Sequence, residues 1–249
     1  MSYSIILPTL NEKGNIIELI ETISDIFVKN ELIYEIIIVD DNSKDGTIQI
    51  VENFIKKNSF IKLYIRKNKK SLPESLNDGI ELALNEYIIW MDADFQHPPE
   101  YIQEFINLSN KNDAIICSRF LKESKRYFNI NQLDKDINEN QSLFYNILCK
   151  RFIFNDITDF TSGYICLNKK VLNGYRLQGY YGDYFLNLIF HIKLKNYTLT
   201  EIPFSDNLRK TGLSKTIVNL NLKYLYTCFR YLITFLSVMI KSLWMKIKL

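Results

Sequence analysis

The feature of this sequence that most constrains its fold is a regular alternation of short apolar runs with amphipathic stretches over the first 118 residues. The apolar runs are continuous and rich in Ile and Val, as expected for parallel strands that are covered on both faces. Alternating strands and helices with right-handed crossovers produce a doubly wound, Rossmann-like α/β sheet. The expected strands are Tyr3–Leu7, Glu35–Asp40, Ile61–Ile65, Tyr87–Met91 and Ala114–Ser118, and the expected helices are 15–28, 47–57, 73–85 and 98–109.

The alternation breaks after Arg119. Residues 122–140 are polar, of mixed charge and without a clear period, so we predict an irregular loop there, either a lid beside a ligand site or plain disorder. Regular patterns then resume, and no internal repeat or second-domain linker is evident. They predict helices over 142–154 and 183–194, a turn over 159–163, strands over 164–167 and 198–202, and a helical tail from Ile217 onward.

The composition favours an ordered globular protein in a reducing compartment. Of 249 residues, 47% are hydrophobic and 24% are charged, which excludes an intrinsically disordered chain. The four cysteines lie in apolar stretches without CxxC spacing, so we expect buried free thiols. The apolar run at Tyr3 has no basic segment or cleavage site of a signal peptide, and a cytoplasmic location is therefore expected.

The charge is distributed unevenly along the chain. Residues 207–249 contain eight Lys and Arg and no acidic residue, whereas residues 1–206 contain 23 basic and 28 acidic residues, a net charge of −5. The most apolar part of the tail, Tyr231–Ile240, is shorter than the roughly 20 residues that span a bilayer. We therefore predict a catalytic domain over 1–215 and a basic, aromatic-rich, amphipathic tail over 216–249 that lies on a membrane surface. Packing as a core or oligomer helix is the alternative.

Two carboxylates follow the fourth expected strand directly, in the segment Asp92-Ala93-Asp94. Both can turn toward one pocket, where their mutual repulsion is relieved by a hard divalent cation such as Mg²⁺ or Mn²⁺. Gln96 offers a carbonyl oxygen in the same turn. A pair of acids with this spacing is common on protein surfaces, so its position at a strand end is what favours a metal site.

Polar segments also follow the first and second expected strands. Glu12 ends the segment Pro8-Thr9-Leu10-Asn11-Glu12, and Asp41 belongs to a segment that runs to Thr47. Ligands bind at the carboxyl ends of strands in such sheets, where an acidic side chain accepts hydrogen bonds from a base or ribose. Asp45 or Thr47 can equally be a helix cap, with no part in binding.

These segments resemble the family 2 glycosyltransferases with a GT-A fold, and within them the dolichol-phosphate (polyprenol-phosphate) mannose synthases. The matching pieces are PTLNE at 8–12, EIIIVDDNSKDGT at 35–47, MDADFQHPPE at 91–100, SRF at 118–120, DFTSGY at 159–164 and R-x-x-G-x-S-K at 209–215. They occur in family order across nearly the whole chain.

The resemblance implies a role for each matching residue. Pro8, Glu12, Val39 and Asp41 would line the nucleoside pocket, together with Leu10, which replaces the tyrosine of the family. Asp92, Asp94 and Gln96 would hold the metal, and Ala93 would lie against the donor. Arg119, Arg209 and Lys215 would contact the donor diphosphate or the acceptor phosphate, as the geometry of Arg and the charge of Lys allow. Leu10, and a segment at 71–75 that lacks the usual glycines, leave the donor sugar open.

The implied reaction moves a hexose such as mannose from a GDP- or UDP-linked sugar to a polyprenyl or dolichyl phosphate, with Mg²⁺ or Mn²⁺. An anionic phosphate acceptor needs no general base, whereas a sugar hydroxyl would need one, for which Asp159 and Asp183 are the candidates. Asp183 can also be a helix cap. A nucleotidyltransferase and a non-catalytic nucleotide-binding scaffold remain alternatives, and no nucleic-acid partner is expected.

Overall fold

A computed structural model describes residues 1–67, 70–124, 137–205, 207, 210 and 222–247 of the chain. Arg209 and Lys215 lie outside these residues. The strands are β1 (Ser2–Thr9), β2 (Ile33–Asp40), β3 (Ile61–Ile65), β4 (Tyr87–Trp90), β5 (Ala114–Ser118), β6 (Ile165–Asn168) and β7 (Leu199–Pro203). The α-helices are α1 (Ile16–Lys29), α2 (Thr47–Ile55), α3 (Leu72–Leu82), α4 (Ile102–Leu108), α5 (Ile137–Phe152), α6 (Tyr184–Leu194) and α7 (Leu222–Ile247), with 3-10 turns η1 (Pro99–Tyr101) and η3 (Lys169–Leu172).

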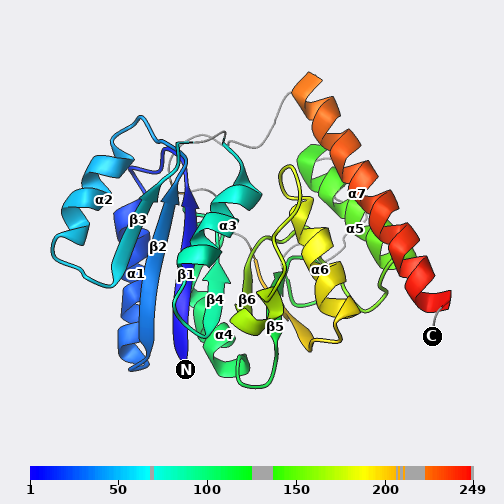
Figure 1. Cartoon of the computed structure of the whole chain (residues 1–249), viewed down its shortest axis with the longest axis horizontal. Coiled ribbons are helices and arrows are strands. Elements are labelled where there is room, and N and C mark those ends of the chain that lie inside the picture. The colour runs from blue at the N-terminus through cyan, green and yellow to red at the C-terminus, as the bar shows by residue number, and fades with distance from the viewer. Residues whose placement is uncertain (68–69, 125–136, 206, 208–209, 211–221, 248–249) are drawn as a thin grey trace.

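The described strands form one mixed sheet in the order β3-β2-β1-β4-β6-β5-β7 (Figure 1). The pairs β1–β2, β2–β3, β1–β4 and β5–β7 are parallel, whereas β6 is antiparallel to both β4 and β5. The predicted mostly parallel α/β fold is therefore confirmed. The direction of β6 matters for function, because its amino end reaches the edge at which the parallel strands end.

Helices cover both faces of the sheet, which explains why its strands are apolar at successive positions. Ile36 and Ile38 of β2 pack on the face that is covered by α1 and α4, while Ile37 and Val39 pack on the face that is covered by α3, α5 and α6. Side chains alternate between the faces of a strand, so both sets must be apolar when both faces are buried.

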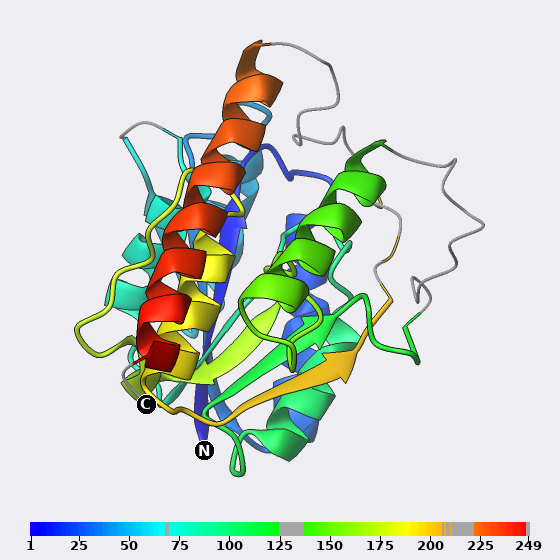
Figure 2. The same cartoon turned by 90° about the vertical axis from the view of Figure 1, so that its right-hand side faces the viewer.

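Helix α7 crosses the face that carries α5 and α6, at the end of the sheet far from β3 (Figures 1 and 2). The buried ring of Phe235 meets Tyr145 and Phe152 of α5, and Thr234 donates a hydrogen bond to the buried Asp183 at the start of α6 (3.0 Å). The opposite side of α7 is apolar and exposed. It carries Leu225, Tyr226, Phe229, Leu232, Ile233, Leu236, Ile240, Leu243 and Trp244. Among the described helices, none has the length and apolarity that a bilayer span requires.

Three local predictions were wrong. The single helix expected over 98–109 begins with the 3-10 turn η1 and becomes α-helical only at Ile102. Helix α5 begins at Ile137, within the segment that was expected to be irregular. Cys117, Cys149 and Cys166 are buried free thiols as expected, but Cys228 is exposed, because it lies on the outer side of α7.

Candidate active site

The loops after β1, β2, β4 and β5 meet at the carboxyl edge of the sheet, together with the turn that precedes β6. The first two loops are joined by a network of hydrogen bonds. Asn11, whose φ is +53°, donates its backbone N–H to Ser43 Oγ (2.7 Å), and its side chain accepts a bond from the Lys44 N–H (2.8 Å). Asp45 accepts the N–H groups of Lys13 (3.1 Å) and Thr47 (3.0 Å). The Asp45 side chain therefore has the structural role that the sequence left open, because it joins the two loops.

Asp41, a predicted nucleoside-binding residue, is held by Arg66. The Arg66 guanidinium, whose side chain is only 3% exposed, forms ion pairs with Asp41 and, through Nε, with Asp78 Oδ2 of α3 (2.6 Å). Arg66 also donates a hydrogen bond to Ser75 Oγ (3.1 Å). Burial lowers the pKa of Arg66, but its hydrogen bonds with Asp78 and Asp41 outweigh burial and raise it. The ion pair with Arg66 fixes the Asp41 carboxylate in one orientation.

The other predicted nucleoside-binding residues lie around Asp41. Glu12 is buried and its Oε2 accepts a hydrogen bond from Asn15 (2.7 Å), while its backbone N–H donates to Thr47 (3.0 Å). Pro8 and Leu10 are half-buried at the end of β1. Val39 is fully buried and packs in the core against α3, so its side chain is not exposed to a ligand.

Asp92, Ala93 and Asp94 follow β4 at the same edge. Asp94 and Ala93 are buried, and Asp92 is half-buried. The Gln96 N–H donates to Asp94 Oδ1 (3.0 Å), a bond that closes a tight turn in which Phe95 has φ of +65°. Positive φ is strained for a bulky residue, and such strain is concentrated at functional sites.

His97 supports this turn from behind. Its Nδ1 accepts the backbone N–H of Asp92 (3.0 Å), and its ring stacks on Tyr164 with centroids 4.9 Å apart. This hydrogen bond occupies Nδ1 and fixes the position of the Asp92 backbone.

The residues of this turn fit a hard divalent cation. Asp92 and Asp94 are carboxylates two positions apart, and Gln96 carries an amide oxygen, which are ligands that Mg²⁺ and Mn²⁺ prefer. Among the described residues there is no group of three or more His, Cys, Asp or Glu side chains that could hold a metal. An ion at this place would therefore need oxygens from a substrate or water to complete its coordination.

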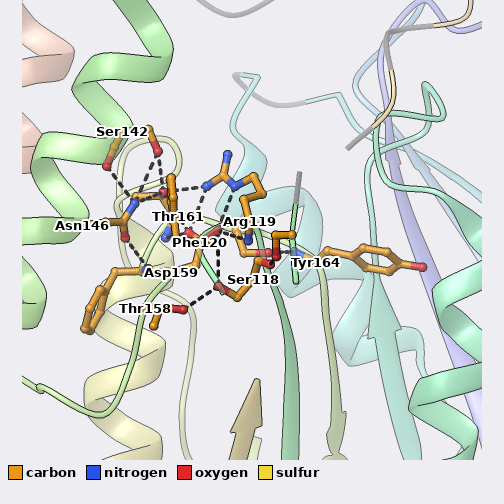
Figure 3. Close-up of polar contacts among 12 residues, drawn as sticks. Ser118, Arg119, Phe120, Ser142, Asn146, Thr158, Asp159, Thr161 and Tyr164 are labelled. Atoms are coloured by element: carbon orange, nitrogen blue, oxygen red, sulfur yellow. Dashed lines mark hydrogen bonds and ion pairs between the residues drawn. The ribbon is translucent and has the colours of Figure 1, made fainter. Parts of the chain in front are cut away.

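Arg119 lies on the other side of β4, at the end of β5, and is paired with Asp159 (Figure 3). Its Nε donates to Asp159 Oδ2 (2.8 Å) and one terminal nitrogen donates to Oδ1 (3.0 Å), a two-pronged pair that orients the guanidinium. The same nitrogen also donates to Thr161 Oγ1 (2.8 Å). Asp159 is fully buried, which raises its pKa, but the charge and hydrogen bonds of Arg119 outweigh burial and hold that pKa below its usual value.

A second layer of polar residues supports the turn that carries Asp159. From α5, Asn146 donates to Thr161 Oγ1 (3.0 Å) and accepts the N–H of Phe160 (2.5 Å) (Figure 3). From β7, Glu201 accepts the N–H groups of Thr158 (2.9 Å) and Asp159 (3.0 Å). Burial, together with the nearby charge of Asp159, raises the pKa of Glu201 to about 7.

Neither of the two candidate general bases has a carboxylate that is free to accept a proton from a substrate. Asp159 is occupied by Arg119, as described above. Asp183 is almost fully buried and accepts hydrogen bonds from the N–H groups of Tyr180 (2.7 Å) and Tyr181 (2.8 Å) and from Thr234 of α7 (3.0 Å). Asp183 therefore links α7 to the start of α6 through hydrogen bonds.

Asn207 and Lys210 lie beside the candidate metal turn. The N–H of Asn207 donates to the Gln96 carbonyl (3.1 Å), and that of Lys210 donates to the Asp94 carbonyl (3.4 Å). The Lys210 ammonium lies 5.2 Å from the centre of the Phe95 ring, a favourable cation–π contact, and pairs with Glu18 of α1. The predicted phosphate ligands Arg209 and Lys215 are outside the described residues and stay predictions.

Sequence reasoning missed Arg66, Asn146 and Glu201. Each acts on a site residue that is distant in sequence, and none belongs to a segment that resembles a binding motif. For Arg66 the sequence offered one signal, a basic residue directly after the strand β3. Its burial, which is rare for Arg without an acidic partner, is seen only in the structure.

The sequence profile of the family described as "Glycosyl transferase family 2" matches residues 4–176. The chain belongs to this family. The dolichol-phosphate mannosyltransferase of Pyrococcus furiosus is 31% identical over 225 residues, which are 86% of this chain and 59% of that protein. The enzyme of the same name from Mycosarcoma maydis is 28% identical over 90% of this chain and 76% of its own length. That from Saccharomyces cerevisiae is 26% identical over 90% of this chain and 85% of its own length.

Solved structures of low sequence identity share the fold. Glucosyl-3-phosphoglycerate synthase from Mycobacterium tuberculosis, in complex with Mn²⁺, UDP and phosphoglyceric acid, superposes with a TM-score of 0.68. It is 15% identical, and the match covers 96% of this chain and 78% of that chain. The same synthase in complex with UDP alone gives a TM-score of 0.67 at 15% identity, covering 96% of this chain and 80% of that chain. The GT-A fold that was expected from the sequence is thereby confirmed.

Proposed function

We propose that this protein transfers a hexose, mannose in the first instance, from a nucleotide sugar to a polyprenyl or dolichyl phosphate. The observation that carries the proposal is the occupation of Asp159 and Asp183, since a sugar hydroxyl acceptor requires a carboxylate base. A lipid phosphate is already anionic and attacks without one. The Pyrococcus, Mycosarcoma and Saccharomyces relatives, which are named dolichol-phosphate mannosyltransferases, support the same acceptor.

The nucleoside would bind between the loops after β1 and β2. Asp41 is oriented by Arg66, and its carboxylate would accept hydrogen bonds from the donor base or ribose. Glu12, Pro8 and Leu10 would complete this pocket, with Val39 beneath it in β2. The donor base is tested as GDP against UDP, because the names of the mannosyltransferase relatives mention no nucleotide and the structural neighbour was solved with UDP.

Asp92, Asp94 and Gln96 would hold Mg²⁺ or Mn²⁺, and Ala93 would lie against the donor. Bound there, the ion would act as a Lewis acid toward the departing diphosphate. The proteins of similar fold that were solved with Mn²⁺ and UDP support a divalent ion at this place. Phe95 and His97 keep the two carboxylates fixed, which reduces the reorganisation needed when substrate binds.

Arg119 would bind the donor diphosphate or the acceptor phosphate. Its Nε and one terminal nitrogen are bonded to Asp159 and Thr161, and the side chain is half-buried at the edge of the site. Arg209 and Lys215 would add two more cations and so reduce the repulsion between two phosphate-bearing substrates. The contacts of Asn207 and Lys210 with the 94–96 turn support the placing of this segment near the ion.

The tail over 216–249 would rest on the cytoplasmic face of a membrane, where the lipid acceptor lies, while 1–215 forms the catalytic domain. The exposed side of α7 carries large apolar and aromatic residues, and its sequence contains Lys and Arg but no Asp or Glu. Such a helix suits an interface with anionic lipid, where each basic residue contributes about 1 kcal/mol. Sedimentation with vesicles containing phosphatidylserine tests this. Replacement of Phe229 and Trp244 by Ser should release the protein, and unchanged binding would contradict the proposal.

The transfer reaction is tested by incubation of the protein with Mn²⁺, polyprenyl phosphate and a panel of GDP- and UDP-sugars. Release of nucleoside diphosphate together with a glycolipid supports the proposal, and thermal shift with each donor identifies the base. Transfer to a sugar hydroxyl but not to lipid phosphate would contradict the argument from Asp159 and Asp183. In a parallel incubation with a nucleoside triphosphate and a sugar 1-phosphate, pyrophosphate release would indicate a nucleotidyltransferase. Binding of nucleotide sugar without turnover in either assay would indicate a scaffold.

A further inference from the structure

Glu201 makes more hydrogen bonds to the active-site turn than any structural role in its own strand requires. It lies in the middle of β7, in register with Ile116 of β5. Its carboxylate accepts the backbone N–H groups of Thr158 (2.9 Å) and Asp159 (3.0 Å) and lies 3.0 Å from Thr158 Oγ1, which can also donate to it. The bonds hold the first two residues of the turn that leads into β6.

The same carboxylate also ends a chain of hydrogen bonds from β5. Ser118 Oγ lies 2.6 Å from Thr158 Oγ1 and accepts the N–H of Phe120 (3.2 Å). When Thr158 donates its only hydroxyl proton to Glu201, it accepts the proton of Ser118. Glu201 is therefore linked to Arg119 by two routes. One passes through Asp159, and the other passes through Thr158 and Ser118 to the backbone around Arg119 (Figure 3 labels these residues except Glu201).

We propose that Glu201 is a positioning residue for the binding of substrate phosphate. Glu201 fixes the backbone of Thr158 and Asp159, and this fixes the Asp159 carboxylate that orients the Arg119 guanidinium. The inference rests on the proposed function, in which Arg119 binds a phosphate. Arginine has several rotatable bonds, and a two-pronged carboxylate partner limits them only if that partner is itself fixed. The backbone N–H groups at 158 and 159 provide this anchorage, and Glu201 is their acceptor.

The decisive variant is Glu201→Gln, which keeps the size of the side chain but turns one acceptor oxygen into an NH₂ group. This group cannot accept the backbone N–H that it faces, so the turn must shift. Misplacement of a binding group by 1 Å can cost about 100-fold in rate. Arg119→Ala first identifies the substrate whose KM depends on Arg119. For that substrate we expect Glu201→Gln to raise KM about tenfold and to change kcat less than about twofold.

Asp113→Asn is the matched control. Asp113 accepts the N–H and the hydroxyl of Thr198 (both 2.9 Å), so it repeats the type of contact that Glu201 makes, but at the opposite end of β5 and β7. It pairs with Lys170 and touches no residue of the site. A purely structural role for Glu201 predicts that both variants lower the melting temperature and leave both KM values unchanged.

Two measurements decide between positioning and stability. In a double-mutant cycle, Glu201→Gln should change KM less than twofold when Arg119 is already Ala, because its effect passes through Arg119. An equal effect in both backgrounds overturns the proposal.

The second measurement does not depend on turnover, so it separates this inference from the proposed function. The Arg119 Nε–H signal in an NMR spectrum of the full chain, assigned by its loss in Arg119→Ala, should exchange slowly with water because Asp159 holds it. Glu201→Gln should accelerate this exchange and Asp113→Asn should not. Unchanged exchange in Glu201→Gln refutes positioning even if transfer occurs, and faster exchange supports it even if no transfer is found.

Discussion

Two arginines next to α3 allow a measurement of what burial adds to an ion pair. Arg66 and Arg176 each bridge two carboxylates. Arg66 pairs with Asp41 and Asp78, whereas Arg176 pairs with Glu74 and Glu81. The Arg66 side chain is 3% exposed and that of Arg176 is 50% exposed. The comparison therefore changes the access of water while the number of charged partners stays the same.

Arg66→Met should lower the free energy of unfolding by about 3 kcal/mol. Removal of one partner from a buried ion pair costs about 3–5 kcal/mol, because the remaining charge is left without compensation. The lower end applies here, since the Asp78 side chain is 23% exposed and water can partly replace the guanidinium. Arg176→Met should cost less than about 1 kcal/mol, as is usual for exposed pairs.

Urea unfolding at pH 7, with the m-value held in common, gives both free energies. Isothermal titration with nucleoside diphosphate and Mn²⁺ should show weaker binding for Arg66→Met only. A loss below 1 kcal/mol for Arg66→Met, or equal losses for the two variants, would refute the reasoning.

Three further predictions concern the site and the core. Asp92→Asn and Asp94→Asn should each lower metal-stimulated transfer at least about 100-fold, or about 2.7 kcal/mol of barrier, measured as glycolipid formed against Mn²⁺ concentration; a loss below tenfold would argue against a metal site. Gly79→Ala should destabilise the protein by roughly 1 kcal/mol, because a Cβ at this position would lie 2.5 Å from Ile6 Cγ2. The cost of overpacking, about 1–3 kcal/mol, exceeds the gain of about 1 kcal/mol in helix propensity. A higher melting temperature would contradict this. The raised pKa of Glu201, about 7 against 4.5, means that the folded state binds its proton more tightly, so this contribution is present below pH 4.5 and is lost as pH rises to about 7. It amounts to about 3 kcal/mol at most, and the difference in stability between the parent chain and Glu201→Gln should change by that order across this window.

Much of the sheet was predictable because each strand carries its own signal. The runs at Ile61–Ile65 and Ala114–Ser118 have the bounds that were expected, since both are apolar segments that end at polar residues. The direction of β6 was not predictable. The pattern of a four-residue strand does not show its direction, which depends on how the chain returns from α5.

The candidate site was predictable where its residues lie at strand ends, as for Asp41, Asp92 and Asp94. What these residues are bonded to was not. Arg66 and Glu201 reach their partners only after the sheet has formed, and the sequence separation of 25 positions between Arg66 and Asp41 leaves no local trace. Asp183 shows the same limit, because a carboxylate before a helix resembles a cap until Thr234 of α7 is seen beside it.

The strand order also has a consequence for synthesis on the ribosome. Strands β1 to β4 are mutually paired and come from the first 90 residues, so the half of the sheet that carries Glu12 and Asp41 can form early. The free edge of β4 must then wait for β6, which begins at Ile165. At about 5–20 residues per second this takes roughly 4–15 s, during which an apolar strand edge is open to other chains. The nascent protein is thus most vulnerable to aggregation after the half of the sheet that carries Glu12 and Asp41 is complete and before the turn that carries Asp159 has been paired with β5.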